Sequence, residues 1–83
     1  MTEDESYAVL RPIFARVFGR DVALRPETTA RDVVGWDSLK HFDIIMDIED
    51  ALGIEIDGSK LQDLTNVGDL AALVRAEAAA KAG

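Results

Sequence analysis

The chemistry that this sequence offers is concentrated in GWDSLKHFDII, residues 35–45. Ser38 directly follows Asp37 and stands three residues before His41, the only histidine of the chain. A serine with a histidine one helical turn away suggests a hydrolytic nucleophile and its base. However, GWDSL lacks the second glycine of a nucleophile elbow, and Asp37 precedes the serine instead of orienting the histidine. We therefore predict no catalytic residues and a protein that is not an enzyme.

A calcium site is the second chemistry to weigh, because EIDG at 55–58 resembles the middle of an EF-hand loop. If Gly58 takes the sixth position of that loop, Gly53 takes the first, where aspartate is required. Leu64 then takes the twelfth position, where the bidentate glutamate is required. Both ends fail, and the chain has no cysteine to bind zinc as a thiolate. We predict no metal site.

Two interpretations of Ser38 remain. In the structural one, Asp37 caps a helix and Ser38 is an ordinary first-turn residue of a domain that only docks other proteins. In the other, the serine hydroxyl carries a covalently attached group. A phosphodiester on a first-turn serine is stabilised by the unpaired N–H groups and the positive end of the helix dipole. Asp37 would support the modification by helping to position a metal ion.

The elements that must position Ser38 begin with an N-terminal helix. Thr2 and Glu5 have the capping-box spacing, and the helix is expected to end near Gly19. Pro12 lies inside this pattern, so it either kinks the helix or delays its start. One face of the helix is apolar and is expected to enter the core: Leu10, Ile13, Phe14 and Val17.

After Gly19 the periodicity disappears, which predicts a long loop to Trp36 with one short turn near Thr29–Val33. A second helix over 38–52 follows, with Asp37 as its N-cap and Gly53 at its end.

The C-terminal third predicts two more helices. Leu61 and Leu64 suggest one short helix, and Thr65 or Asn66 caps a final one. The buried face of that final helix is expected to comprise Val67, Leu70, Ala71 and Val74. The prediction is an all-α bundle of three main helices and one short helix, forming a single domain over residues 1–83.

Charge narrows the class of partner. Residues 37–63 hold eight acidic and two basic residues, which gives −6 of the formal net charge of −7. An acidic middle third repels nucleic acid phosphates and anionic lipid, and it favours partners with a basic patch. No apolar run approaches the roughly 20 residues that a bilayer needs. We expect a monomeric, cytoplasmic protein that binds neither nucleic acid nor membrane.

The sequence as a whole resembles the acyl carrier proteins of fatty acid and polyketide synthesis. The resemblance rests on ARVFGR at 15–20, DSL at 37–39, HFDIIMDIEDALGIEI at 41–56 and LTNVGDLAALV at 64–74. It implies that Ser38 receives 4′-phosphopantetheine from coenzyme A through a magnesium-dependent phosphopantetheinyl transferase. It also implies that an acyl group rides on this arm as a thioester, with the arm supplying the thiol that the chain lacks.

In this family the second helix is the surface that partner enzymes recognise. At about 100° per residue, its core arc is expected to contain Phe42, Ile45, Ile48 and Leu52. Apolar residues bordered by acids then form a docking patch for acyl-loading, condensing or acyltransferase enzymes with basic patches. The alternative for its apolar members is incomplete burial in the core. The predicted partner-binding residues are Leu39, Lys40, Asp43, Met46, Asp47 and Asp50.

Three residues depart from the pattern of fatty acid synthesis. Lys40 stands where those carriers usually have an acid, and His41 stands where a small residue is usual, so we expect a partly buried histidine. Trp36 either packs the loop down or touches the arm or a partner. These features look more like a discrete carrier of a polyketide or other specialised pathway. An aminoacyl or peptidyl carrier and an unmodified docking domain are the alternatives.

Overall fold

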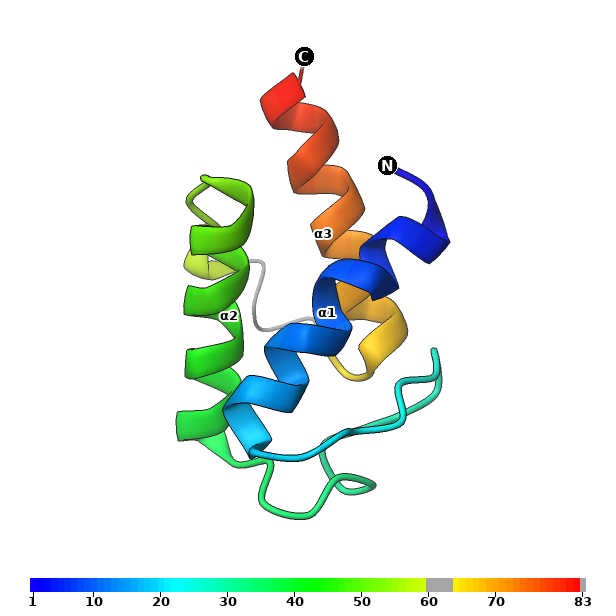
Figure 1. Cartoon of the computed structure of the whole chain (residues 1–83). Coiled ribbons are helices and arrows are strands. Elements are labelled where there is room, and N and C mark those ends of the chain that lie inside the picture. The colour runs from blue at the N-terminus through cyan, green and yellow to red at the C-terminus, as the bar shows by residue number, and fades with distance from the viewer. Residues whose placement is uncertain (60–63, 83) are drawn as a thin grey trace.

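The computed structural model describes residues 1–59 and 64–82, and three helices account for most of them (Figure 1). These are α1 (Glu3–Phe18), α2 (Ser38–Leu52) and α3 (Val67–Ala82). No strand occurs within the described ranges, so the all-α prediction is confirmed. α1 packs against both α2 and α3, and it crosses in front of them in Figure 1. The predicted short helix around Leu61 and Leu64 is not confirmed, because residues 60–63 lie outside the described residues.

The ends of α1 follow from local chemistry. Glu5 N–H donates to the Thr2 hydroxyl at 3.1 Å, and Thr2 N–H donates to the Glu5 carboxylate at 2.8 Å, which completes the predicted capping box. Gly19 ends the helix with φ 69°, in the left-handed region that glycine adopts without strain. Pro12 lies inside α1 and is exposed, so it does not delay the helix start.

The core is formed by buried side chains from all three helices. Leu10 and Phe14 come from α1, Ile44 and Ile48 from α2, and Leu70 and Val74 from α3; each is at most 1% exposed. Burial of a large apolar side chain contributes about 1.5–3 kcal/mol, so these six residues contribute strongly to stability. The predicted apolar face of α3 is confirmed, because Val67 and Ala71 are fully buried as well.

The loop between α1 and α2 is tied to the beginning of α3. The carbonyl oxygens of Thr28 and Pro26 accept hydrogen bonds from Val67 N–H at 2.8 Å and Gly68 N–H at 2.9 Å. These are N–H groups that a helix start leaves without an intrahelical partner. A Cβ at position 68 would lie 2.9 Å from the Pro26 oxygen, so this close approach requires glycine. The loop thereby caps α3.

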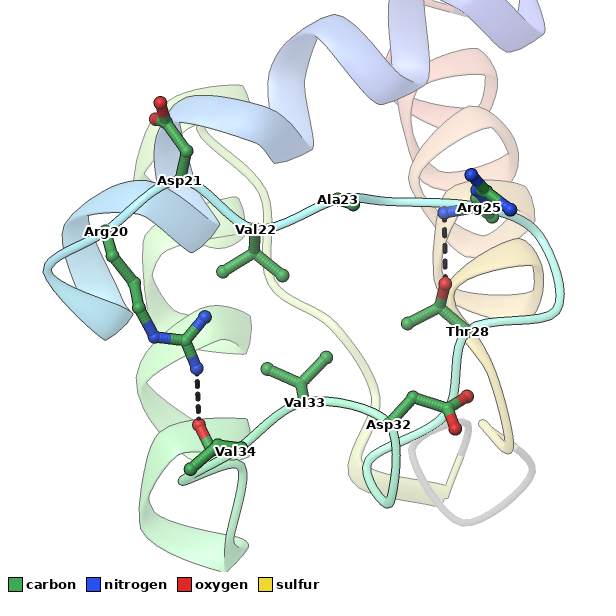
Figure 2. A pocket seen from close by; sticks show the side chains of 9 residues that line it. All are labelled: Arg20, Asp21, Val22, Ala23, Arg25, Thr28, Asp32, Val33 and Val34. Atoms are coloured by element: carbon green, nitrogen blue, oxygen red, sulfur yellow. Dashed lines mark hydrogen bonds between the residues drawn. The ribbon is translucent and has the colours of Figure 1, made fainter.

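The two limbs of this loop are held together by side chains (Figure 2). Arg20 donates to the Val34 carbonyl oxygen at 2.6 Å, and Val22 points toward Val33, which is 6% exposed. A hollow of about 410 Å³ lies between the limbs. The predicted turn is present, since Asp32 N–H donates to the Thr29 carbonyl at 3.0 Å. The loop is therefore ordered by its own contacts, and it leads directly into the residues before α2.

Candidate attachment site

Ser38 is the first residue of α2, and its side chain is exposed. Asp37 is the N-cap, as predicted: its Oδ1 accepts a hydrogen bond from Lys40 N–H at 2.9 Å. The first bond to a backbone carbonyl at this helix start runs from His41 N–H to the Asp37 carbonyl at 2.9 Å. The N–H groups of Ser38 and Leu39 precede it and have no intrahelical acceptor. A negative group on the Ser38 oxygen would therefore lie beside two available donors and the positive end of the helix dipole.

Ser38 borders a hollow of about 450 Å³ on the surface. The other residues that line it are Ala30, Trp36, Asp37, His41 and Leu64. They come from the loop, the start of α2 and the segment before α3, so three parts of the chain meet at the serine. The hollow offers largely apolar and aromatic surface within reach of a group attached to the Ser38 oxygen.

Trp36 is fixed by the aromatic residues of α1. Its ring centroid lies 5.3 Å from that of Phe14 and 6.3 Å from that of Phe18, both in edge-to-face geometry. Such contacts add to the energy of burial and restrict the ring to one orientation. Of the two roles considered for Trp36, the structure supports packing of the loop. Because the ring also lines the hollow beside Ser38, this packing shapes the site.

His41 is half-buried and stacks on Trp36, with ring centroids 6.0 Å apart and an interplanar angle of 20°. Burial lowers the pKa of His41 from its ordinary value of 6.5, because it disfavours the charged imidazolium. The ring is therefore mostly neutral at pH 7. No hydrogen bond joins it to Ser38, although both lie among the described residues. The partial burial agrees with the prediction for His41.

The exposed face of α2 differs from the predicted one in its rotation. Phe42 was expected in the core arc and is instead 60% exposed, whereas Ile44, which the predicted arc omits, is fully buried. The reason is that Ile44, Ile45 and Ile48 are all buried in the core, and this rotation of α2 leaves the Phe42 side chain exposed. The adjacent isoleucines Ile44 and Ile45 are the feature of the sequence that indicates this rotation of the helix. Leu39 and Met46 flank Phe42 on the exposed face and are 76% and 45% exposed.

The charged residues of α2 divide into two groups. Asp43 and Asp50 are exposed beside the apolar residues, as predicted. Asp47 forms an ion pair with Arg16 of α1, and Lys40 Nζ donates to the Val17 carbonyl oxygen at 3.2 Å. Of the six predicted partner-binding residues, the structure thus gathers Leu39, Asp43, Met46 and Asp50 on one free face and directs Lys40 and Asp47 toward α1.

The part of the chain that the structure describes lacks two further features. It contains no group of three or more His, Asp or Glu side chains arranged to hold a metal ion. None of its helices combines the length and the apolar character needed to cross a bilayer.

Comparison with known proteins connects this geometry to a family. A family model described as a phosphopantetheine attachment site matches residues 8–74. An acyl carrier protein from an Exiguobacterium strain is 31% identical over 75 residues, which cover 89% of this chain and 95% of that protein. One from Thermotoga maritima is 27% identical over 74 residues, covering 88% and 91%. The solution structure of a holo acyl carrier protein from Geobacter metallireducens matches with a TM-score of 0.87 and 42% identity, covering 93% and 90%.

Proposed function

The chain belongs to the acyl carrier protein family, and we propose that it carries acyl groups as thioesters on a 4′-phosphopantetheine arm attached to the Ser38 hydroxyl. Members of this family are carriers and not enzymes. The observation that carries the proposal is the position of Ser38: an exposed hydroxyl on the first residue of α2, beside a hollow of about 450 Å³. The arm supplies the thiol, which this chain cannot, because it contains no cysteine.

The residues around Ser38 suit such a group. The free N–H groups of Ser38 and Leu39 are placed to donate to the phosphodiester oxygens, and the Asp37 cap keeps the helix start in the conformation that exposes them. Trp36 and Leu64 offer apolar surface to the arm at the mouth of the site. In this proposal Asp37 supports attachment by holding the geometry of the helix start.

We propose the exposed face of α2 as the docking surface, defined as Leu39, Phe42, Asp43, Met46 and Asp50. It combines three exposed apolar side chains with two exposed carboxylates, which is the composition of an interface with apolar anchors and a charged rim. Its partners are the phosphopantetheinyl transferase and acyl-handling enzymes that present basic residues. Lys40 and Asp47 lie at its edge toward α1.

For the pathway, we propose a discrete carrier of polyketide or other specialised synthesis, acting as a cytoplasmic monomer. The support is the sequence WDSLKH together with the contacts of its unusual residues. Lys40 binds the end of α1, and His41 stacks on Trp36 beside the attachment site. The similarity to acyl carrier proteins favours acyl cargo over aminoacyl cargo.

Intact mass measurement tests the attachment site. The apo protein, incubated with coenzyme A, Mg²⁺ and a broad-specificity phosphopantetheinyl transferase, should gain the mass of one arm. Ser38→Ala should retain the helix content of the wild type, because alanine is the best helix former, and it should gain nothing. A mass gain in Ser38→Ala would place the attachment elsewhere, and no gain in the wild type would refute the carrier function.

A further inference from the structure

The acidic residues of α2 are not equally available to a partner. Asp43 and Asp50 are exposed, whereas the Asp47 side chain is 16% exposed and is held by Arg16. Arg16 Nε donates to Asp47 Oδ2 at 3.2 Å, and an Nη of the same guanidinium contacts Oδ1. Both carboxylate oxygens are thus engaged by a residue 31 positions earlier in the chain. This paired geometry is the stronger and more specific form of an arginine–carboxylate contact.

The ion pair lies in a groove of about 380 Å³ between α1 and α2. Pro12, Ile13 and Ala51 provide apolar lining, and Asp47 and Asp50 provide two carboxylates. This combination fits an arginine or lysine, whose aliphatic stem packs on apolar surface while its charged head meets a carboxylate. Arg16 also lines the groove, and its side chain remains 70% exposed. The groove therefore already contains the kind of side chain that a basic partner would bring.

We propose that Arg16 is a specificity-determining residue that occupies Asp47 and so keeps the basic residues of partner enzymes out of the α1–α2 groove. The inference rests on the proposed docking surface of α2. With Asp47 neutralised, a partner must direct its charge to Asp43, which does not line the groove, or to Asp50, which lines the groove but is exposed. An enzyme whose arginine or lysine reaches the groove meets a competing guanidinium, and its encounter with the carrier is slowed.

The test compares two arginines of the same helix. Arg16→Gln releases Asp47, whereas Arg11→Gln removes the same charge from an exposed residue that forms no ion pair within the described part of the chain. The rate of Ser38 modification by the transferase, with coenzyme A and Mg²⁺, is measured at substrate concentrations below saturation. The Arg16→Gln variant should be modified roughly two- to fivefold faster than the wild type at low salt. The gain for the Arg11→Gln variant should be less than half as large.

Two more variants complete the design. Asp47→Asn added to Arg16→Gln should abolish the gain, and Arg16→Lys, which keeps the charge but loses the two-point contact, should lie between wild type and Arg16→Gln. The Asp47 carboxyl ¹³C signal should shift on addition of the transferase in Arg16→Gln and not in the wild type. Equal rates for Arg16→Gln and Arg11→Gln, with no difference in the Asp47 signal, would overturn the proposal.

Asp43→Lys separates this inference from the docking surface on which it rests. It reverses an unpaired acid of that surface, so it should slow modification at low salt and less at high salt. If Asp43→Lys has no effect, the docking surface itself is refuted. If it slows modification while Arg16→Gln behaves like Arg11→Gln, only the role of Arg16 is refuted.

Discussion

At the scale of single residues, the geometry of Ser38 is set by the cap that precedes it, because Asp37 Oδ1 accepts a hydrogen bond from Lys40 N–H at 2.9 Å. Ser38 and Asp37 owe their geometry to the helix start, which is determined by neighbouring residues and is therefore readable locally. The contacts of Lys40 and Asp47 were not predictable in this way. Their partners, Val17 and Arg16, are 23 and 31 residues away in sequence, and only the packing of α1 on α2 brings them together.

His41 gives a prediction about pH. Burial lowers its pKa in the folded protein below the ordinary value of 6.5, so between the two values the unfolded chain binds more protons. The free energy of unfolding should therefore fall as the pH is lowered from about 7.5 to about 5.5, and His41→Gln should remove this part of the dependence.

Chemical denaturation at several pH values measures this effect. The cap carboxylates do not interfere in that range, because the pKa values of Glu5 and Asp69 are lowered from 4.5 and 3.8 by hydrogen bonds with Thr2 and Thr65. Their contribution is lost only at more acidic pH, as they become protonated. A wild-type slope that persists unchanged in His41→Gln would assign the dependence to other groups.

At the scale of elements, the helix ends were predicted more accurately than the helix faces. Thr2, Asp37 and Gly53 mark the ends of α1 and α2 because capping depends on local side chains and backbone conformation. For the final helix the sequence predicts either Thr65 or Asn66 as the N-cap. In the structure the Asn66 side chain accepts the hydrogen bond from Asp69 N–H, at 2.8 Å. The face of α2 depends on how far that helix rotates against its neighbours. Because α2 carries apolar residues at both Phe42 and Ile44, its sequence alone does not decide which of the two side chains faces the core.

The corrected face of α2 predicts opposite outcomes for two neighbouring truncations. Ile44→Ala removes a fully buried side chain and should lower the free energy of unfolding by about 2–5 kcal/mol. Phe42→Ala removes a side chain that is 60% exposed and should change it by about 0.5 kcal/mol or less. Urea denaturation of the two variants, compared with the wild type, gives both values. A larger loss of unfolding free energy in Phe42→Ala would show that Phe42 belongs to the core and not to the proposed docking surface.

At the scale of the whole molecule, the fold separates the functions of its parts. All three helices contribute to the core, and the loop caps α3 and places Trp36 beside Ser38. α2 presents both Ser38, the proposed attachment residue, at its start and exposed acids along its exposed face. The sequence indicated this arrangement through its acidic middle third. It did not indicate that a basic residue of α1 neutralises Asp47.

The central claim is that the protein carries acyl groups as thioesters on an arm at Ser38, and mass spectrometry before and after neutral hydroxylamine tests it most directly. The apo protein is first loaded by the transferase from acyl-coenzyme A. Because the chain has no cysteine, any thioester must lie on the attached arm. Hydroxylamine should therefore remove the acyl group alone and leave the mass of the holo protein, while Ser38→Ala gains no mass at any step. Acylation that resists hydroxylamine, or acylation of Ser38→Ala, would contradict the account.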